Sequence, residues 1–170
     1  GLVPMIPRVA ESGVRLAVSL NATTEAIRDE LMPINKKYPM AELLKACKEY
    51  AYETRDKVTF EYVLLKGVTD SLEDARRLKE ITHNIPCKIN IIPFNEHPGA
   101  DYKRPDDKTI LRFQKELMDI GVHVLLRRTM GRDIYAACGQ LRSKFEGHPE
   151  KMTPDVGRPS QLGLNSPALA

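Results

Sequence analysis

The sequence lacks the features that mark several classes of protein. It has no tryptophan in 170 residues, and no apolar run approaches the roughly 18 residues that a membrane-spanning helix needs. The first residues show neither the charged region nor the apolar region of a signal peptide. We therefore expect a chain that acts in the cytoplasm and has no membrane partner.

Motifs that hold metals or activate nucleophiles are also missing. There is no CxxC or CxxxCxxC pattern, the four histidines are scattered, and no metal site is predicted. Neither a glycine-rich phosphate loop nor a serine-histidine-aspartate elbow is present. The three cysteines are an odd number at wide spacing, which fits a reducing compartment better than a disulfide scaffold.

The charge is small in total but concentrated in one segment. The net charge is +3, and basic and acidic residues balance within 1–120 and within 143–170. The whole excess lies in 121–142, where four arginines face one aspartate. The arginines are Arg127, Arg128, Arg132 and Arg142.

Short β-branched and aliphatic runs alternate with segments of helical period. The predicted strands are 14–20, 58–65, 88–92 and 122–126, and the predicted helices are 40–50, 72–81 and 110–120. This alternation predicts an α/β fold in which parallel strands alternate with helices. Because a complete eight-fold barrel needs about 250 residues, the chain is either a small doubly wound sheet or an arc of a (β/α) barrel.

Local sequence signals predict where the helices start and where the hydrophobic periodicity ends near the C-terminus. Ser71 with Asp74 is close to a capping box, Asp106 or Asp107 can cap the last helix, and Pro39 suits a first helical turn. From residue 143 onward the periodicity stops and proline and glycine recur. We expect residues 1–142 to form one unit and 143–170 to form a mobile tail without chemistry.

Polar residues stand where predicted strands end. Ser19, Asn21 and Asn95 could converge as neutral hydrogen-bonding groups at the carboxyl edge of the sheet, where parallel α/β proteins bind ligands. The two asparagines could equally be turn residues. Glu61 lies within an apolar strand and points either into a polar barrel interior, which is favoured, or to a solvated sheet edge.

The three cysteines have different sequence settings. Cys47 falls on an apolar helix stripe and Cys87 opens a strand, so both are predicted to be small core residues. Cys138 lies between small residues just after the arginine cluster, where nearby positive charge would favour the nucleophilic thiolate. A third buried cysteine is the alternative.

Taken as a set, the motifs resemble the RlmN branch of the radical S-adenosylmethionine (SAM) RNA methyltransferases. The similarity runs in order and at matching spacing from residue 1 to about 142. The segments that carry it are 19–22 (SLNA), 28–38 (RDELMPINKKY), 59–65 (TFEYVLL), 88–95 (KINIIPFN), 127–129 (RRT) and 136–141 (AACGQL).

The resemblance implies the C-terminal part of a partial (β/α) barrel that binds SAM and a [4Fe-4S] cluster. Such an enzyme methylates C2 of adenine in 23S ribosomal RNA and in some transfer RNAs, needs an electron donor for its cluster and is expected to be a monomer. The cluster loop, CxxxCxxC, lies earlier in the family's barrel. The chain by itself is therefore expected to be inactive.

Site residues follow from the resemblance position by position. Cys138 matches the cysteine that receives a methyl group from SAM and presents it as methyl-cysteine, and a second cysteine upstream in the family then forms a disulfide with it. Ser19, Leu20, Asn21 and Asn95 match SAM contacts. The family usually has histidine where Asn21 stands.

Near Cys138 the sequence departs from the family again, since Met130 to Tyr135 replaces the common Arg-Gly-Asp-Asp-Ile-Asp. This bears on the local RNA contact, for which Arg127, Arg128 and Arg132 are the candidates. Two alternatives remain open: a Cfr-type enzyme that methylates C8, and a catalytically silent RNA-binding half-barrel. A CxxxCxxC segment upstream would distinguish an enzyme from the silent module.

Overall fold

A computed structural model describes residues 2–97 and 99–127 of the chain. Three of the predicted site residues, Arg128, Arg132 and Cys138, lie outside these described residues, as do the predicted boundary at 142 and the tail 143–170.

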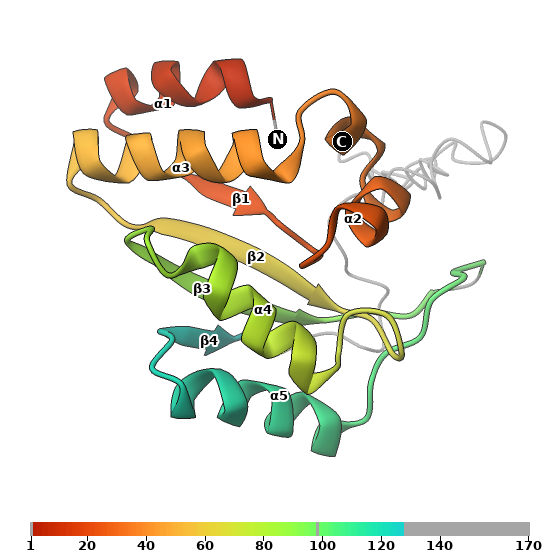
Figure 1. The fold of residues 1–170 in the computed structure, drawn as a ribbon. Helices are drawn as coiled ribbons and strands as arrows, with labels where there is room; N and C mark the ends of the chain where they lie inside the picture. The colour runs from red at the N-terminus through yellow and green to blue at the C-terminus, as the bar shows by residue number, and fades with distance from the viewer. Residues whose placement is uncertain (1, 98, 128–170) are drawn as a thin grey trace, which may run out of the picture. The chain divides into compact units, whose positions relative to one another are not determined.

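The described chain alternates helices with four strands that all run in the same direction (Figure 1). In chain order the elements are η1 (Val3–Met5), α1 (Ile6–Ser12), β1 (Ala17–Ser19), α2 (Glu25–Leu31), η2 (Pro33–Lys36), α3 (Met40–Thr54), β2 (Val58–Leu64), α4 (Leu72–Thr82), β3 (Cys87–Pro93), α5 (Asp107–Asp119) and β4 (Val124–Leu126). The strands form one parallel sheet in the order β1-β2-β3-β4.

The two faces of this sheet differ in composition and in what covers them. In β2 every second residue is completely buried, and these residues join one core with apolar side chains from α3, α4 and α5. The core residues of β2 are Val58, Phe60, Tyr62 and Leu64. The alternate residues Thr59, Glu61 and Val63 are half-buried on the opposite face.

This one-sided arrangement decides between the two folds that the sequence allows. A doubly wound sheet carries helices on both faces and reverses its strand order, whereas consecutive parallel strands with helices on one face form an arc of a (β/α) barrel. The described strands are consecutive, and their buried residues share a single core with the helices. The prediction of an α/β barrel arc with parallel strands is confirmed.

The helix starts follow their predicted caps. Ser71 and Asp74 form a capping box at α4, and the Asp106 side chain accepts a hydrogen bond from the Thr109 amide at the start of α5. Pro39 is the residue just before α3 and not part of its first turn.

The first strand is shorter than predicted, and two helices were missed. The predicted strand 14–20 is reduced to three residues, and it begins only at Ala17 because the Tyr50 hydroxyl donates to the Val14 carbonyl and accepts from the Leu16 amide. Helices α1 and α2 have seven residues each, which is too short for a clear helical period.

The prediction of a core cysteine is confirmed for Cys47, whereas Cys87 lies at the margin of the core. Cys47 is completely buried in the core, and burial raises the pKa of its thiol to about 12. Cys87 is half-buried and packs against the same core, and both are free thiols. Within residues 2–97 and 99–127, no helix is long and apolar enough to cross a membrane.

Candidate functional site

The carboxyl edge of the sheet gathers the strand ends at which ligands bind in parallel α/β proteins. All four strands end there, because the sheet is entirely parallel (Figure 1). Ser19 ends β1, Asn95 follows β3 and Arg127 follows β4. The fold thus places these sequence-predicted residues at one edge.

Ser19 and Glu61 lie side by side on the face away from the core. They are paired in the register of β1 and β2, and the Ser19 hydroxyl donates to Glu61 Oε2 at 3.5 Å. Asn90 of β3 continues the same row across the sheet. Since β2 lies between β1 and β3, the alternative that Glu61 sits on a solvated sheet edge is wrong.

Asn21 extends the sheet beyond the end of β1. Its backbone has φ 58°, in the left-handed region, and its side-chain Oδ1 accepts a hydrogen bond from the Val63 amide at 3.2 Å. Its Nδ2 approaches the Met32 sulfur at 3.6 Å. The prediction left open whether Asn21 is a turn residue or a ligand contact, and the structure gives its amide a clear structural partner.

The side chain of Leu20 is buried in the core, and its backbone amide is hydrogen-bonded to β2. Its side chain is 0% exposed and belongs to the core, while its amide donates to the Glu61 carbonyl at 2.9 Å. A contact from Leu20 to a ligand would therefore come from its backbone.

Asn95 is held much less firmly. It lies two residues beyond β3, is half-buried, and has no hydrogen-bond partner for its side-chain amide among the described residues. The same loop reaches α2, where the Tyr102 hydroxyl donates to Glu30 Oε1 at 2.9 Å. An unpaired amide at this edge is available to bind a ligand.

Arg127 is an exposed cation at the same edge. Its amide donates to the Ile91 carbonyl at 2.8 Å, which continues the β3–β4 ladder by one residue. Its side chain is exposed and has no ion-pair partner in the part of the chain that the structure describes.

The burial of two charged residues behind this edge was not predicted from the sequence. Arg28 of α2 is 0% exposed and contacts the strand-end segment 19–20. Asp74 accepts hydrogen bonds from Thr23 at 2.7 Å and from Arg77 at 2.6 Å. A charged residue in a short helix gives no signal of burial, because surface helices are full of charges.

The surroundings of Asp74 tie α4 to the loop that follows β1. Burial alone would raise the pKa of Asp74, but hydrogen bonds from Ser71, Thr23 and Arg77 outweigh it and hold the pKa below its usual value. The carboxylate is therefore the stable form, and it anchors Thr23 close to the candidate site.

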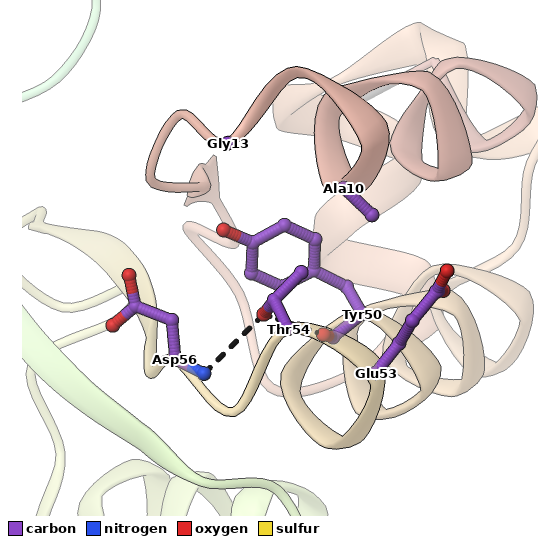
Figure 2. A pocket seen from close by; sticks show the side chains of 6 residues that line it. All are labelled: Ala10, Gly13, Tyr50, Glu53, Thr54 and Asp56. Atoms are coloured by element: carbon purple, nitrogen blue, oxygen red, sulfur yellow. Dashed lines mark hydrogen bonds between the residues drawn. The ribbon is translucent and has the colours of Figure 1, made fainter.

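A cavity of about 360 Å³ lies at the opposite end of the sheet, among residues that precede β1 and β2. Figure 2 shows the residues that line it. It is lined by Ala10, Gly13, Tyr50, Glu53, Thr54 and Asp56. Both hydrogen bonds of the Tyr50 hydroxyl are already made to the backbone of residues 14 and 16. The residues that line the cavity come from segments that precede β1 and β2, so the cavity is not part of the carboxyl-edge site.

No group of three histidine, cysteine, aspartate or glutamate side chains that could hold a metal ion occurs within residues 2–97 and 99–127. The polar groups of the predicted site at the carboxyl edge are the Ser19 hydroxyl, the amides of Asn21 and Asn95 and, beside Ser19, the Glu61 carboxylate. This donor set suits an organic ligand with hydroxyl and amino groups.

The sequence is similar to those of bacterial dual-specificity RNA methyltransferases named RlmN. It is 57% identical over 164 residues to the protein from Bdellovibrio bacteriovorus, covering 96% of this chain and 40% of the relative. The protein from Geobacter sulfurreducens is 52% identical over 147 residues, or 86% of this chain and 41% of the relative. No family model matches the chain.

Among solved structures, the fold matches a radical SAM methyltransferase from Sphaerobacter thermophilus. The TM-score is 0.79 at 44% sequence identity, over 82% of this chain and 42% of that one. The chain spans about two fifths of the length of the curated relatives it matches. On this similarity, which extends over nearly all of its residues, the chain belongs to the RlmN family of RNA methyltransferases.

Proposed function

We propose that this chain is part of a SAM-dependent methyltransferase that modifies C2 of adenine in 23S rRNA and in some tRNAs. The observation that carries the proposal is the 57% identity to a dual-specificity RNA methyltransferase over 96% of the chain. The carboxyl edge of the sheet adds support, because polar groups gather there at the place where this architecture binds ligands.

The residues at this edge suit SAM. SAM carries ribose hydroxyls, an amino group and a carboxylate, which need both hydrogen-bond donors and acceptors. Ser19 supplies a hydroxyl, Asn95 an unpaired amide, and Glu61 a carboxylate on the face away from the core. In the proposed complex Ser19, Asn95 and the backbone of Leu20 and Asn21 hold SAM, which supplies the methyl group and, with a reduced [4Fe-4S] cluster, the radical chemistry.

The described residues do not offer ligands for that cluster, since no three metal-binding side chains gather among them. We place the cluster in parts of the enzyme beyond this segment, in line with the family pattern, and we expect a partner to supply its electrons. The segment alone is then inactive.

Two roles in the proposal fall mainly on residues beyond the described part; of the residues involved, the structure describes Arg127. Cys138, which follows the arginine-rich segment, carries a methyl group on Sγ and presents it to the adenine. Arg127, Arg128 and Arg132 pair with RNA phosphates beside it. Residues 1–142 form the functional unit, and the tail 143–170 carries no chemistry.

The test uses the complete protein, loaded with its cluster under anaerobic conditions, together with methyl-labelled SAM and transcripts of 23S rRNA and tRNA. The RNA is digested to nucleosides and analysed by mass spectrometry. Labelled 2-methyladenosine is expected. Labelled 8-methyladenosine would assign the Cfr-type activity instead, and RNA that is bound but never methylated would identify a silent module.

Two cysteine variants complete this test. Cys138→Ala is expected to abolish turnover, whereas Cys47→Ala, at a thiol buried in the core, is expected to retain it. Full activity of Cys138→Ala would exclude the methyl-cysteine route.

A further inference from the structure

Arg28 is a completely buried arginine in a helix of only seven residues. A buried guanidinium is costly unless its donors are paired. Burial lowers the pKa of Arg28 from its usual value, while the nearby Glu25 and Asp29 partly offset this effect. The hydrogen bonds of the Arg28 guanidinium show how this cost is offset.

One side of the guanidinium binds two consecutive carbonyls of the candidate site. Nε donates to the Leu20 carbonyl at 3.1 Å, and Nη2 donates to the Ser19 carbonyl at 3.3 Å. Figure 1 shows why this is possible, since α2 lies at the end of the sheet toward which β1 points. The planar fork of arginine fixes the directions of both carbonyls, which a single ammonium group could not do.

The other side of Arg28 is tied to neighbouring elements. Nη1 donates to Asn35 Oδ1 at 2.5 Å, and Asn35 Nδ2 donates in turn to Glu25 at 2.5 Å and to Asp29 at 2.8 Å. Glu25 also accepts from the Met40 amide at the start of α3, at 3.0 Å. The fork is therefore anchored to α2, η2 and α3 together.

These contacts end the β1 ladder at a defined point. The Thr59 amide donates to the Leu16 carbonyl, so the two-residue repeat of a parallel ladder would bring the Val63 amide to the Leu20 carbonyl. Instead, the Leu20 carbonyl accepts from Arg28 and the Val63 amide donates to the Asn21 side chain. The chain then leaves the sheet through the left-handed conformation of Asn21.

We propose that Arg28 is a positioning residue for SAM binding: by binding the Ser19 carbonyl and holding the Leu20 carbonyl away from the ladder, it sets the geometry of the segment 19–21. The inference rests on the proposed function, because it assigns SAM to this segment. Arg28 itself touches no ligand and acts through the backbone that it holds.

The test compares Arg28→Met, Arg28→Lys and the control Arg76→Met in the complete, cluster-loaded enzyme. Arg76 is a matched control because it is an arginine on α4 whose side chain is 60% exposed and whose ion pair is with Glu116 of α5, not with the segment 19–21. Each variant is measured for SAM affinity by equilibrium dialysis, for KM and kcat separately, and for thermal unfolding. Hydrogen exchange reports on the amides of 19–24.

Arg28→Met is expected to weaken SAM binding about tenfold at temperatures where the protein is folded, as the loss of one well-oriented hydrogen bond to SAM would. Arg28→Lys, which can reach one carbonyl but not both, is expected to lie between Arg28→Met and the wild type. KM for SAM should rise more than kcat falls, exchange should increase at 19–24, and Arg76→Met should match the wild type.

If Arg28→Met does not fold, Arg28→Lys decides the question. SAM affinity within twofold of the wild type in a folded Arg28 variant would overturn the inference, and so would a loss that only tracks the unfolded fraction. A wild-type enzyme that does not bind SAM would instead overturn the proposed function, so the two failures are distinguishable.

Discussion

The segments that follow β1 and β3 reach the same edge of the sheet but are held very differently. After β1, the segment 19–23 is fixed by the buried Arg28 and by the bond from Thr23 to the buried Asp74. After β3, the Asn95 amide has no hydrogen-bond partner among the described residues. The segment after β1 is therefore fixed by hydrogen bonds in the absence of a ligand, whereas the Asn95 amide after β3 keeps its donors and its acceptor free.

This difference suggests a division of labour at the proposed SAM site. A pre-set segment lowers the entropy cost of binding, because its groups already point in the required directions. An unpaired amide adds a hydrogen bond only when the ligand is present. Variants at the first segment should therefore change both stability and affinity, whereas variants at the second should change affinity alone.

The largest expected effect is at Asp74. Asp74→Ala removes the half of the capping box in which the Asp74 carboxylate accepts from the Ser71 amide, and it takes this acceptor away from Thr23 and Arg77, which should lower the free energy of unfolding by about 3 kcal/mol. Thermal unfolding measures the loss. The matched control is Glu73→Ala, since the Glu73 side chain is 74% exposed. Equal losses of stability in both variants would show that Asp74 does not anchor Thr23.

The same carboxylate predicts a pH dependence. The pKa of Asp74 is depressed in the folded state, so its contribution to stability is fully present above the ordinary carboxyl pKa of about 4 and is lost as the pH falls through its lower folded-state pKa. The difference in stability between the wild type and Asp74→Asn should therefore narrow below about pH 4. A difference that stays constant on acidification would argue against a charged Asp74.

Asn21 and Asn95 provide the most direct test of the comparison. Asn21→Gly keeps the left-handed backbone but deletes the bond to the Val63 amide, and should cost about 1 kcal/mol of stability as well as affinity for SAM. Asn95→Ala should change stability by less than about 0.5 kcal/mol but weaken SAM binding about tenfold. The division of labour fails if Asn95→Ala is the more destabilising of the two.

The smallest effect is expected at Arg127, an exposed cation beyond both segments. If it pairs with one RNA phosphate, Arg127→Ala should reduce the slope of log affinity against log salt concentration by about 0.7 to 0.9. Binding measured across a salt titration checks this, with SAM affinity unchanged. An unaltered slope would leave Arg127 as part of a solvated surface.

Much of the fold could be predicted because it depends on local signals. Alternation in residues 58–64 and helical period in residues 40–50 each follow from side chains that face one core, and Ser71 capped its helix as predicted. The shortened first strand could not be predicted, because it depends on the Tyr50 hydroxyl, which comes from 34 residues further along the chain.

The candidate site was predictable in its location but not in its support. Strand ends in a parallel sheet meet at one edge, so Ser19 and Asn95 could be placed there from the sequence. The groups that hold the segment 19–23 in position could not be found, because Arg28 and Asp74 are charged residues in helices whose sequences look like those of ordinary surface helices. Their burial depends on the packing of α2 and α4 against the sheet, which no local pattern reveals.

The left-handed backbone at Asn21 also limits how this position can vary. Most L-amino acids pay a steric cost there, β-branched side chains the most, whereas glycine, asparagine, aspartate and histidine tolerate it better. The RlmN pattern, with histidine at this position, falls within that set. Asn21 can thus be exchanged for histidine without a change in the left-handed backbone conformation, whereas valine or isoleucine would force the backbone into another conformation.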